Sequence, residues 1–343
     1  MAGLGVAAIE FGLRYLDWPA PVISGWRLTS AEGPVNQAGW RGQKWHRLPS
    51  DFVAVLTGGD EVECVRCPPG ETVDLILERA LQRYNPNARV VTLGSRCYAQ
   101  DQELLGLLEF FRHERADLVI DWAVVARDVP ANVFRTGSIS PGVVVWKPAY
   151  TLKDHVLAGP TEEIGEPVFQ GKLVTLLLSP FIRPGVTWNW GLPEAVAGTT
   201  EPPPGVETKS HVEDALDQQR SGWSISLTPR PPRVSYGIEL TRLLLGRMRD
   251  VATLHGARFS VLVTPPAGEG TSKGPIALEH DGRWFLASPG LRDAAIADVT
   301  KGLDRITEDT AVSSVEDERR VMEKLAAALN QRELLGAAAQ VRH

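Results

Sequence analysis

Three cysteines, Cys64, Cys67 and Cys97, carry the most reactive side chains of this sequence and could in principle meet at one place. Cys64 and Cys67 form a C-x-x-C pair, a spacing that zinc sites use but that is weak evidence on its own. A structural zinc site needs a fourth ligand with matching spacing, and none is evident. Cys97 as a nucleophile needs a nearby base, for which His113 and His155 are the mid-chain candidates. We therefore expect small buried thiols rather than a metal centre.

Short apolar runs alternate with amphipathic segments around these cysteines. Four runs have the length and composition of buried parallel strands: residues 51–56, 88–93, 116–125 and 258–263. Apolar residues recur with helical spacing between and after them, in residues 72–84, 101–111, 236–255 and 315–329. This succession predicts an α/β fold, a flavodoxin-like three-layer αβα arrangement around a central parallel sheet. Because the first run ends in Thr57-Gly58-Gly59, a site is expected directly after it.

Two parts of the chain depart from this alternation. The Gly- and Pro-rich stretch 129–234 is interpreted as an insertion into a domain spanning 47–343, and residues 1–46 as an N-terminal helix with a lead-in segment. The opening apolar stretch is interrupted by Glu10 and Arg14, so it is too short to span a bilayer, and it lacks the features of a cleavable signal. An amphipathic helix is favoured over a truncated membrane anchor, and a cytoplasmic location over other compartments.

The composition narrows the function classes. Hydrophobic residues make up 43% of the chain and charged residues 23%, which is typical of a packed globular protein. The net charge is only −6 and no basic stripe is present, which argues against nucleic-acid binding because neutralising phosphates requires clustered Lys and Arg. The sequence contains no dinucleotide-binding fingerprint, and no cofactor or metal is expected.

Several short segments follow one another with regular spacing: 36–42 (NQAGWRG), 55–60 (VLTGGD), 92–98 (TLGSRCY), 101–105 (DQELL), 116–120 (ADLVI), 147–150 (KPAY) and 255–261 (HGARFSV). In this order they resemble motifs of a bacterial subgroup of SGNH/GDSL hydrolases. The motifs are N-x-x-G-(F/W)-R-G, the G-(D/G)-S nucleophile turn, N-x-G-x-x-G-Y, D-Q-E-L-L, P-D-L-V-(I/V), K-P-x-(Y/F) and H-G-A-x-F-x-V. The resemblance implies the SGNH type of the α/β fold.

The resemblance also implies where ester chemistry would take place. That family uses a serine nucleophile, a glycine N–H and an asparagine amide for the oxyanion, and a late histidine base. Here the serine position falls on Asp60, the glycine on Cys97 and the asparagine on Arg127. The late D-x-x-H segment corresponds to residues 309–314 (DTAVSS), without a histidine, and His280 lies before it. A permanent negative charge at the nucleophile position repels the tetrahedral intermediate, so serine-ester hydrolysis is expected to be lost.

The same positions define the expected site. If Arg127 points into the cleft, it offers Asp60 an ion-pair partner, and a paired carboxylate is a structural group rather than a nucleophile. Arg127 could instead bind a carboxylate or phosphate of a ligand. The positions expected to line the cleft and bind a ligand are Gly59, Gly94, Tyr98 and Asp128.

Three functions remain as alternatives. The first is a non-catalytic SGNH-like protein that binds a carbohydrate, an acylated small molecule or a protein partner through the former active-site cleft. The second is an active esterase or O-acyltransferase, or another reaction, that uses non-standard residues. The third is a scaffold with an idle cleft. The sequence predicts no oligomeric state.

Other conspicuous segments have simpler interpretations. Residues 268–274 (GEGTSKG) are expected to form a flexible loop, because the order of a phosphate-binding loop is absent. Trp188 and Trp190 are expected to be buried, although they could stack on a sugar ring. His113 lies one helical turn from Glu109, which predicts a solvated cluster. Short β-like pieces are predicted in residues 143–146, 172–178 and 281–287.

Overall fold

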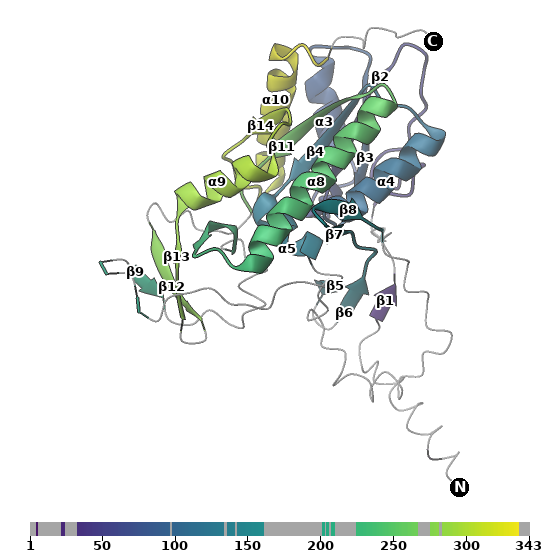
Figure 1. Cartoon of the computed structure of the whole chain (residues 1–343). Coiled ribbons are helices and arrows are strands. Elements are labelled where there is room, and N and C mark those ends of the chain that lie inside the picture. The colour runs from purple at the N-terminus through teal and green to yellow at the C-terminus, as the bar shows by residue number, and fades with distance from the viewer. Residues whose placement is uncertain are drawn as a thin grey trace.

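The computed structural model describes residues 33–96, 98–133, 136–140, 143–160, 201–202, 204–205, 207–209, 224–266, 275–280 and 283–335, together with residues 5 and 22–24. Its centre is a five-stranded parallel sheet flanked by helices (Figure 1). The strands of this sheet are β2 (Phe52–Gly58), β3 (Ala88–Gly94), β4 (Leu118–Ala123), β11 (Arg258–Val263) and β14 (Arg305–Thr307). The predicted α/β class with a central parallel sheet is therefore confirmed.

The order of the strands determines where a ligand site can form. Across the sheet the order is β14-β11-β4-β2-β3, and every neighbouring pair is parallel. Numbered along the chain, this is 2-1-3-4-5, the order found in flavodoxin-like doubly wound folds. The direction of winding reverses between β2 and β4. In such sheets the ends of the two strands at the reversal leave a crevice at the carboxyl edge.

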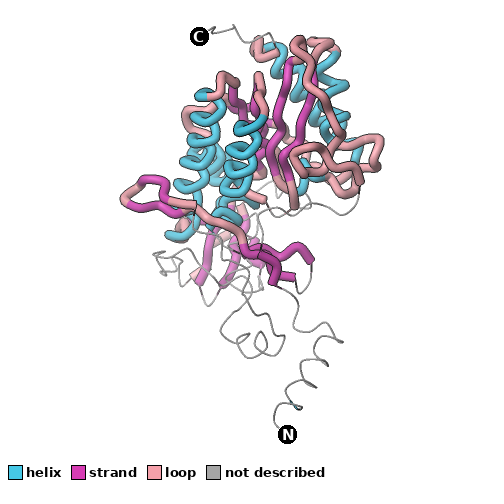
Figure 2. Tube along the Cα trace, turned by 90° about the vertical axis from the view of Figure 1, so that its right-hand side faces the viewer, coloured by secondary structure: helices cyan, strands magenta, loops and turns pink. Residues whose placement is uncertain are grey.

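Helices cover both faces of the sheet, because its strands carry apolar residues on both sides. Val53 and Val55 of β2 face one core, while Ala54 and Leu56 face the other. The first core includes α4 (Gln100–His113), α5 (Val125–Val133), α8 (Pro232–Leu254) and α9 (Pro289–Val299). The second includes α3 (Val73–Gln82) and α10 (Val315–Gln331). Figure 2 shows the strands between these two groups of helices.

Three α-helices of this domain were not predicted, among them the single turn α2 (Asp60–Glu63) after β2. Helix α5 contains Pro130, a residue that usually ends a helix, and it runs past the expected start of the insertion at residue 129. Helix α9 buries only Ala295 and Val299, so its sequence has little apolar periodicity. Strand β14 is three residues long, too short for a periodic signal. Of the predicted helices, α3, α4, α8 and α10 are confirmed within a few residues at their ends.

Smaller sheets accompany the central one. β1 (Val22–Ser24), β5 (Thr136–Ser140) and β6 (Val143–Trp146) form one, and β7 (Thr151–Lys153) pairs with β8 (Val156–Ala158). A third contains β9 (Glu207–Lys209), β10 (Leu227–Thr228), β12 (Ile276–His280) and β13 (Arg283–Ala287). The predicted β-pieces at 143–146 and 281–287 are thus confirmed. The piece at 172–178, Trp188, Trp190, the loop 268–274 and, apart from Gly5, the N-terminal helix lie outside the described residues.

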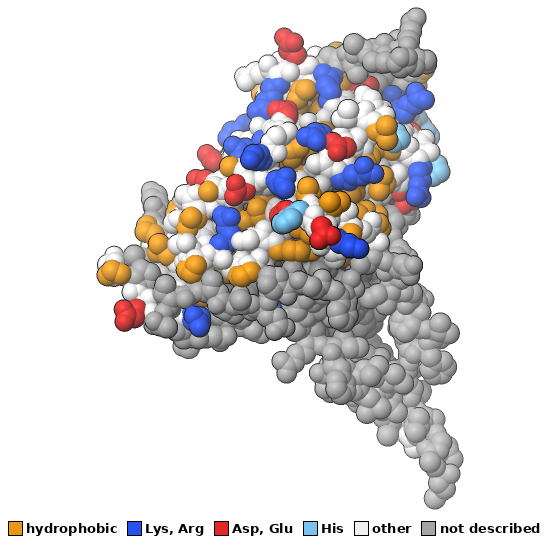
Figure 3. Space-filling model, in the orientation of Figure 1, with side chains coloured by type: hydrophobic (Ala, Val, Ile, Leu, Met, Phe, Trp, Pro, Cys, Tyr) orange, Lys and Arg blue, Asp and Glu red, His pale blue; other side chains and the backbone are white. Residues whose placement is uncertain are grey.

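The visible surface of α8 is charged in both signs. Glu239 and Arg242 lie one turn apart, and Arg249 pairs with Asp250. On the face shown in Figure 3, basic and acidic side chains are interspersed with apolar ones. Among the described helices, none combines the length and the apolar character that crossing a bilayer requires.

A buried ion pair joins two of the motif segments. The Nζ atom of Lys147 lies 2.7 Å from one carboxylate oxygen of Asp101 and 2.8 Å from the other, and both side chains are almost fully buried. Burial raises the pKa of Asp101 to about 6, while the neighbouring Lys147 charge opposes this rise. The segments 101–105 and 147–150 therefore meet at the start of α4.

We expect Lys147→Met to lower the free energy of unfolding by about 3 kcal/mol, because it leaves the Asp101 carboxyl buried without its cation. Urea denaturation followed by circular dichroism measures this change. The matched control is Lys153→Met on β7, an exposed lysine whose loss should change stability by less than about 0.5 kcal/mol. Equal effects of the two substitutions would contradict a stabilising role for the buried pair.

Candidate functional site

Asp60 and Arg127 meet at the point where the winding of the sheet reverses. Asp60 is the first residue of α2 (Asp60–Glu63), the single helical turn after β2, and Arg127 lies in the first turn of α5, after β4. Gly59 between them must be small: a Cβ atom there would lie 2.8 Å from Nη2 of Arg127 and 3.2 Å from the carbonyl oxygen of Tyr98. The short turn and this glycine bring the two strand ends together.

Three carboxylates surround the Arg127 guanidinium. Its Nη1 atom lies 2.7 Å from Oε2 of Glu61 and 3.8 Å from Oδ2 of Asp60, and its Nη2 atom lies 3.3 Å from Oδ1 of Asp128. The expected ion pair with Asp60 is present, but the closest partner is Glu61, which sequence reasoning missed. The only available signal was its position next to Asp60 at the end of an apolar strand.

Neighbouring carboxylates stabilise the protonated, positively charged form of Arg127. Burial disfavours the charged form, but the carboxylates of Glu61, Asp128 and Asp60 outweigh burial and raise the pKa of Arg127. Three acidic neighbours also offset its positive charge. Arg127 is therefore a poor donor for an oxyanion, which needs a preorganised positive potential.

Asp128 is the buried partner of Arg127 and connects it to neighbouring elements. Its side chain accepts hydrogen bonds from the backbone N–H of Val124 at 2.8 Å and from Nε2 of Gln100 at 3.0 Å, which caps the start of α5 and ties it to α4. Asn132 extends this network, since its amide donates to Gln100 at 2.8 Å and to Thr241 of α8 at 2.9 Å. Burial raises the pKa of Asp128 to about 7, against the opposing charge of Arg127.

A second pair of acids lies beneath this cluster. Asp121 of β4 and Glu103 of α4 are both buried, and the hydroxyl of Thr57 donates a 3.0 Å hydrogen bond to Asp121. Burial raises the pKa of both carboxyls, and the neighbouring Asp121 charge further raises that of Glu103. An aspartate inside the apolar run LVIDWA was the signal for this pair.

The other predicted site residues take different places. Gly94 lies beside Gly58 in the register of β2 and β3, where a Cβ atom would lie 2.5 Å from Val62. Tyr98 is buried, and its backbone carbonyl oxygen lies next to Gly59. Cys97 lies outside the described residues. Its role, like those of Gly94 and Tyr98 in binding, stays a prediction.

The side chains of His155 and His255 have partners other than Asp60. His155 bonds Glu239 through Nδ1 at 2.9 Å, and the ring of His255 stacks on Phe111 with centroids 4.5 Å apart. His113 lies at the far end of α4. In the segment 309–314, where the resemblance predicted the family's histidine motif, Ser313 and Ser314 hydrogen-bond the side chain of Asp317.

Cys64 and Cys67 form a disulfide, so the expectation of free thiols at these positions is wrong. Their burial is as expected, with each residue 1% exposed. The physical reason for the bond is local: α2 ends at Cys64 in the left-handed conformation, and the following turn brings the two Cα atoms to 5.3 Å. The sequence spacing alone did not specify this turn.

Glu318, at the start of α10, lies beside the disulfide. Within the part of the chain that the structure describes, Cys64, Cys67 and Glu318 are the one group with the spacing of metal ligands, and their ligand atoms lie within 4.8 Å of one another. Cysteine binds a metal ion as the thiolate, so this group could bind one only after the disulfide is reduced. Its three ligands would still be one short of a closed zinc site. Arg66 already forms an ion pair with Glu318.

No protein-family model matches this chain, and no curated protein matches it either. The fold and the site by themselves therefore define the class of protein. It is an α/β protein with a five-stranded parallel sheet, and an ion-paired acidic cluster occupies the carboxyl edge at the reversal point.

The buried Glu318 should make the stability of this protein depend on pH. Burial raises its pKa to about 8 despite the ion pair with Arg66, so the folded state holds a proton that the unfolded state releases above its ordinary value of 4.5. The free energy of unfolding should therefore fall as the pH rises from 5 to 8, by up to about 4 kcal/mol from this group. Urea titrations at several pH values measure the slope.

In Glu318→Gln, which has no titrating group at this position, the slope should be shallower than in the wild type. Glu323→Gln is the matched control, because Glu323 lies on the same helix but its side chain is 42% exposed. Identical slopes for wild type and Glu318→Gln would show that Glu318 titrates at its ordinary pKa.

Proposed function

We propose that this chain is an SGNH-hydrolase-like protein that has lost serine-ester hydrolysis and binds a small ligand at Asp60 and Arg127. The ligand class that suits the site is a hydroxyl-rich molecule, a carbohydrate or its acylated form. The observation that supports this most is the pairing of Asp60 with Arg127 at the reversal point of the sheet, with both side chains partly open to solvent.

The loss of hydrolysis follows from the charges at the site. An ester hydrolase must stabilise the negative oxygen of a tetrahedral intermediate. In the proposed correspondence with that family Asp60 takes the position of the nucleophile, and Arg127 pairs with Glu61 and Asp128 as well. An acyl group placed at Asp60 would therefore meet a carboxylate-rich surface that opposes the developing charge.

Ligand binding is supported by exposure and by hydrogen-bonding chemistry. The Asp60 side chain is 54% exposed and the Arg127 side chain 29% exposed, so both can reach a ligand, whereas Asp128 is buried beneath them. A carboxylate accepts hydrogen bonds from hydroxyl groups, and a guanidinium donates to hydroxyl oxygens. Ligands of doubly wound sheets bind outside the carboxyl ends of the strands at this reversal point.

The purified protein should neither hydrolyse p-nitrophenyl acetate above the buffer rate nor become labelled by a serine-directed fluorophosphonate. We expect this because position 60 carries a carboxylate instead of a serine, and because the Arg127 charge is already paired with Glu61 and Asp128. An active serine esterase assayed in parallel confirms that both reagents work. Labelling at any residue, located by mass spectrometry, would favour the alternative of an active esterase or O-acyltransferase.

Binding should depend on Asp60. We expect a saccharide that raises the melting temperature of the wild type, found in a panel of plain and O-acetylated oligosaccharides, to bind Asp60→Ala about tenfold more weakly by calorimetry, because a charged hydrogen bond is lost. Asp250→Ala on α8 is the control, since Asp250 is comparably exposed but remote from the sheet edge. Equal affinities of the two variants would exclude Asp60 as the binding residue.

A further inference from the structure

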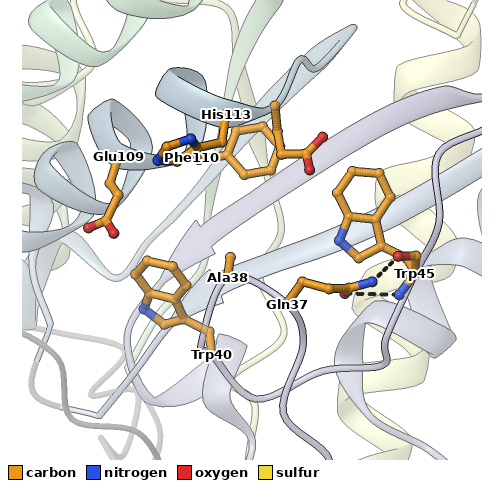
Figure 4. A pocket seen from close by; sticks show the side chains of 8 residues that line it. Gln37, Ala38, Trp40, Trp45, Glu109, Phe110 and His113 are labelled. Atoms are coloured by element: carbon orange, nitrogen blue, oxygen red, sulfur yellow. Dashed lines mark hydrogen bonds between the residues drawn. The ribbon is translucent and has the colours of Figure 1, made fainter.

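A pocket of about 240 Å³ lies at the opposite end of α4 from Asp60. Its walls come from the last turns of α4 and from the lead-in segment at residues 37–45 (Figure 4). Phe110 follows Gln100, which belongs to the Asp60–Arg127 site, by ten residues, or about 15 Å along the helix axis. The pocket is therefore a second, separate place on the molecule.

Aromatic rings form much of the wall of this pocket. Figure 4 shows the rings of Trp40, Trp45 and Phe110 around it, with the side chains of Glu109 and His113 at its edge. Trp40 and Phe110 are each only 3% exposed, so their rings are fixed parts of the fold. Trp45 is only partly buried, so it is the ring that can present its electron-rich face to a ligand.

The wall residues are held in place before any ligand binds. The Asn36 side chain accepts hydrogen bonds from the backbone N–H groups of Ala38 and Trp40, both at 3.1 Å, and donates to the carbonyl of Thr92 in β3 at 2.9 Å. Glycine at position 106 lets the Trp40 ring lie against α4, since a Cβ atom there would be 3.3 Å from that ring.

Trp45 is held by a reciprocal contact. The Gln37 amide donates to its carbonyl oxygen and accepts from its N–H at 3.0 Å. Together with the Asn36 turn, this contact holds the backbone at both tryptophans of the lead-in segment. A site that is already ordered loses little conformational entropy when it binds a ligand, which favours affinity.

The charge of the lining is negative. Glu109 and Glu114 contribute carboxylates, and no lysine or arginine lines the pocket, whose only other titratable side chain is His113. Carboxylates attract cations, and the face of an aromatic ring attracts them as well through its quadrupole. The carboxylates and the aromatic ring therefore both favour a positively charged ligand.

From these contacts we propose that the pocket binds an organic ammonium group, with a quaternary ammonium such as trimethylammonium as the best fit. The partly exposed Trp45 ring suits the methyl groups, which need no hydrogen-bond acceptor, and the two glutamates supply the counter-charge. This ligand class is independent of the hydroxylated ligand proposed for Asp60. The glutamate–histidine cluster that the sequence predicts as merely solvated is, in this interpretation, part of a binding site.

Choline is the probe for this site, and 3,3-dimethyl-1-butanol is its uncharged counterpart of nearly the same shape. Titration of the full chain, followed by tryptophan fluorescence and calorimetry, should show saturable choline binding at least about tenfold tighter than that of the neutral alcohol, because only the cation gains the electrostatic attraction. Equal affinities for choline and the alcohol, or no saturable choline binding, would overturn the proposal.

Two variants test the residues. Glu109→Gln keeps the shape of a half-buried side chain and should weaken choline binding several-fold; Trp45→Phe should weaken it as well, because phenylalanine offers a smaller ring. Glu323→Gln on α10 is the matched control and should bind choline as the wild type does. Unchanged affinity in both pocket variants would overturn the assignment.

The two proposals can fail separately. Asp60→Ala should leave choline binding unchanged, so loss of saccharide binding in that variant does not affect this result. Binding of methyl glucoside in the pocket, shown by its loss in Trp45→Phe, together with no choline binding would replace the ammonium ligand by a sugar and overturn the proposal.

Discussion

The carboxyl edge of this sheet depends on the Arg127 guanidinium, because its ion pairs hold together the elements that follow β2 and β4. The guanidinium bridges α2, which follows β2, and α5, which follows β4, through the carboxylates of Glu61 and Asp128. Asp128 in turn caps the start of α5 and accepts a hydrogen bond from the Gln100 side chain of α4. One cation thus connects the elements at the reversal point. An isolated guanidinium or carboxylate would be costly here, but together they are stable in a half-buried position.

Buried acids recur in this protein, and several of them lie close to another charged group. Asp101 has the Lys147 ammonium, and Glu318 has the Arg66 guanidinium. Asp121 and Glu103 lie near each other, and the Asp121 charge adds to burial in raising the pKa of Glu103. Because burial disfavours a carboxylate, each of these groups holds its proton more tightly than in water.

Helix α4 separates two chemically different places. Its first residue, Gln100, belongs to the polar network at the carboxyl edge, while its last turns present Glu109 and Phe110 to the aromatic pocket. The middle of the helix is apolar and packs in the core of the sheet, with Leu104 and Leu107 fully buried. A rigid helix of this kind keeps the two places at a fixed distance, so each can serve a ligand of its own.

The sequence by itself determined the elements with strong local periodicity. The continuous apolar runs predicted β2, β3, β4 and β11, and helical spacing predicted α3, α4, α8 and α10, because burial on a sheet or helix face imposes a period that nearby residues display. It also placed Asp60 and Arg127 at one edge, since the carboxyl ends of parallel strands meet there.

Only the tertiary structure decided which side chains became partners. Arg66 and Glu318 are 252 residues apart in sequence, and no local pattern relates them. Glu61 rather than Asp60 became the closest partner of Arg127 because one helical turn points Glu61 inward and leaves Asp60 at the surface. The aromatic pocket likewise depends on packing of the lead-in segment against α4. Periodicity records that a residue is buried, but the identity of its neighbour is set by how distant elements pack.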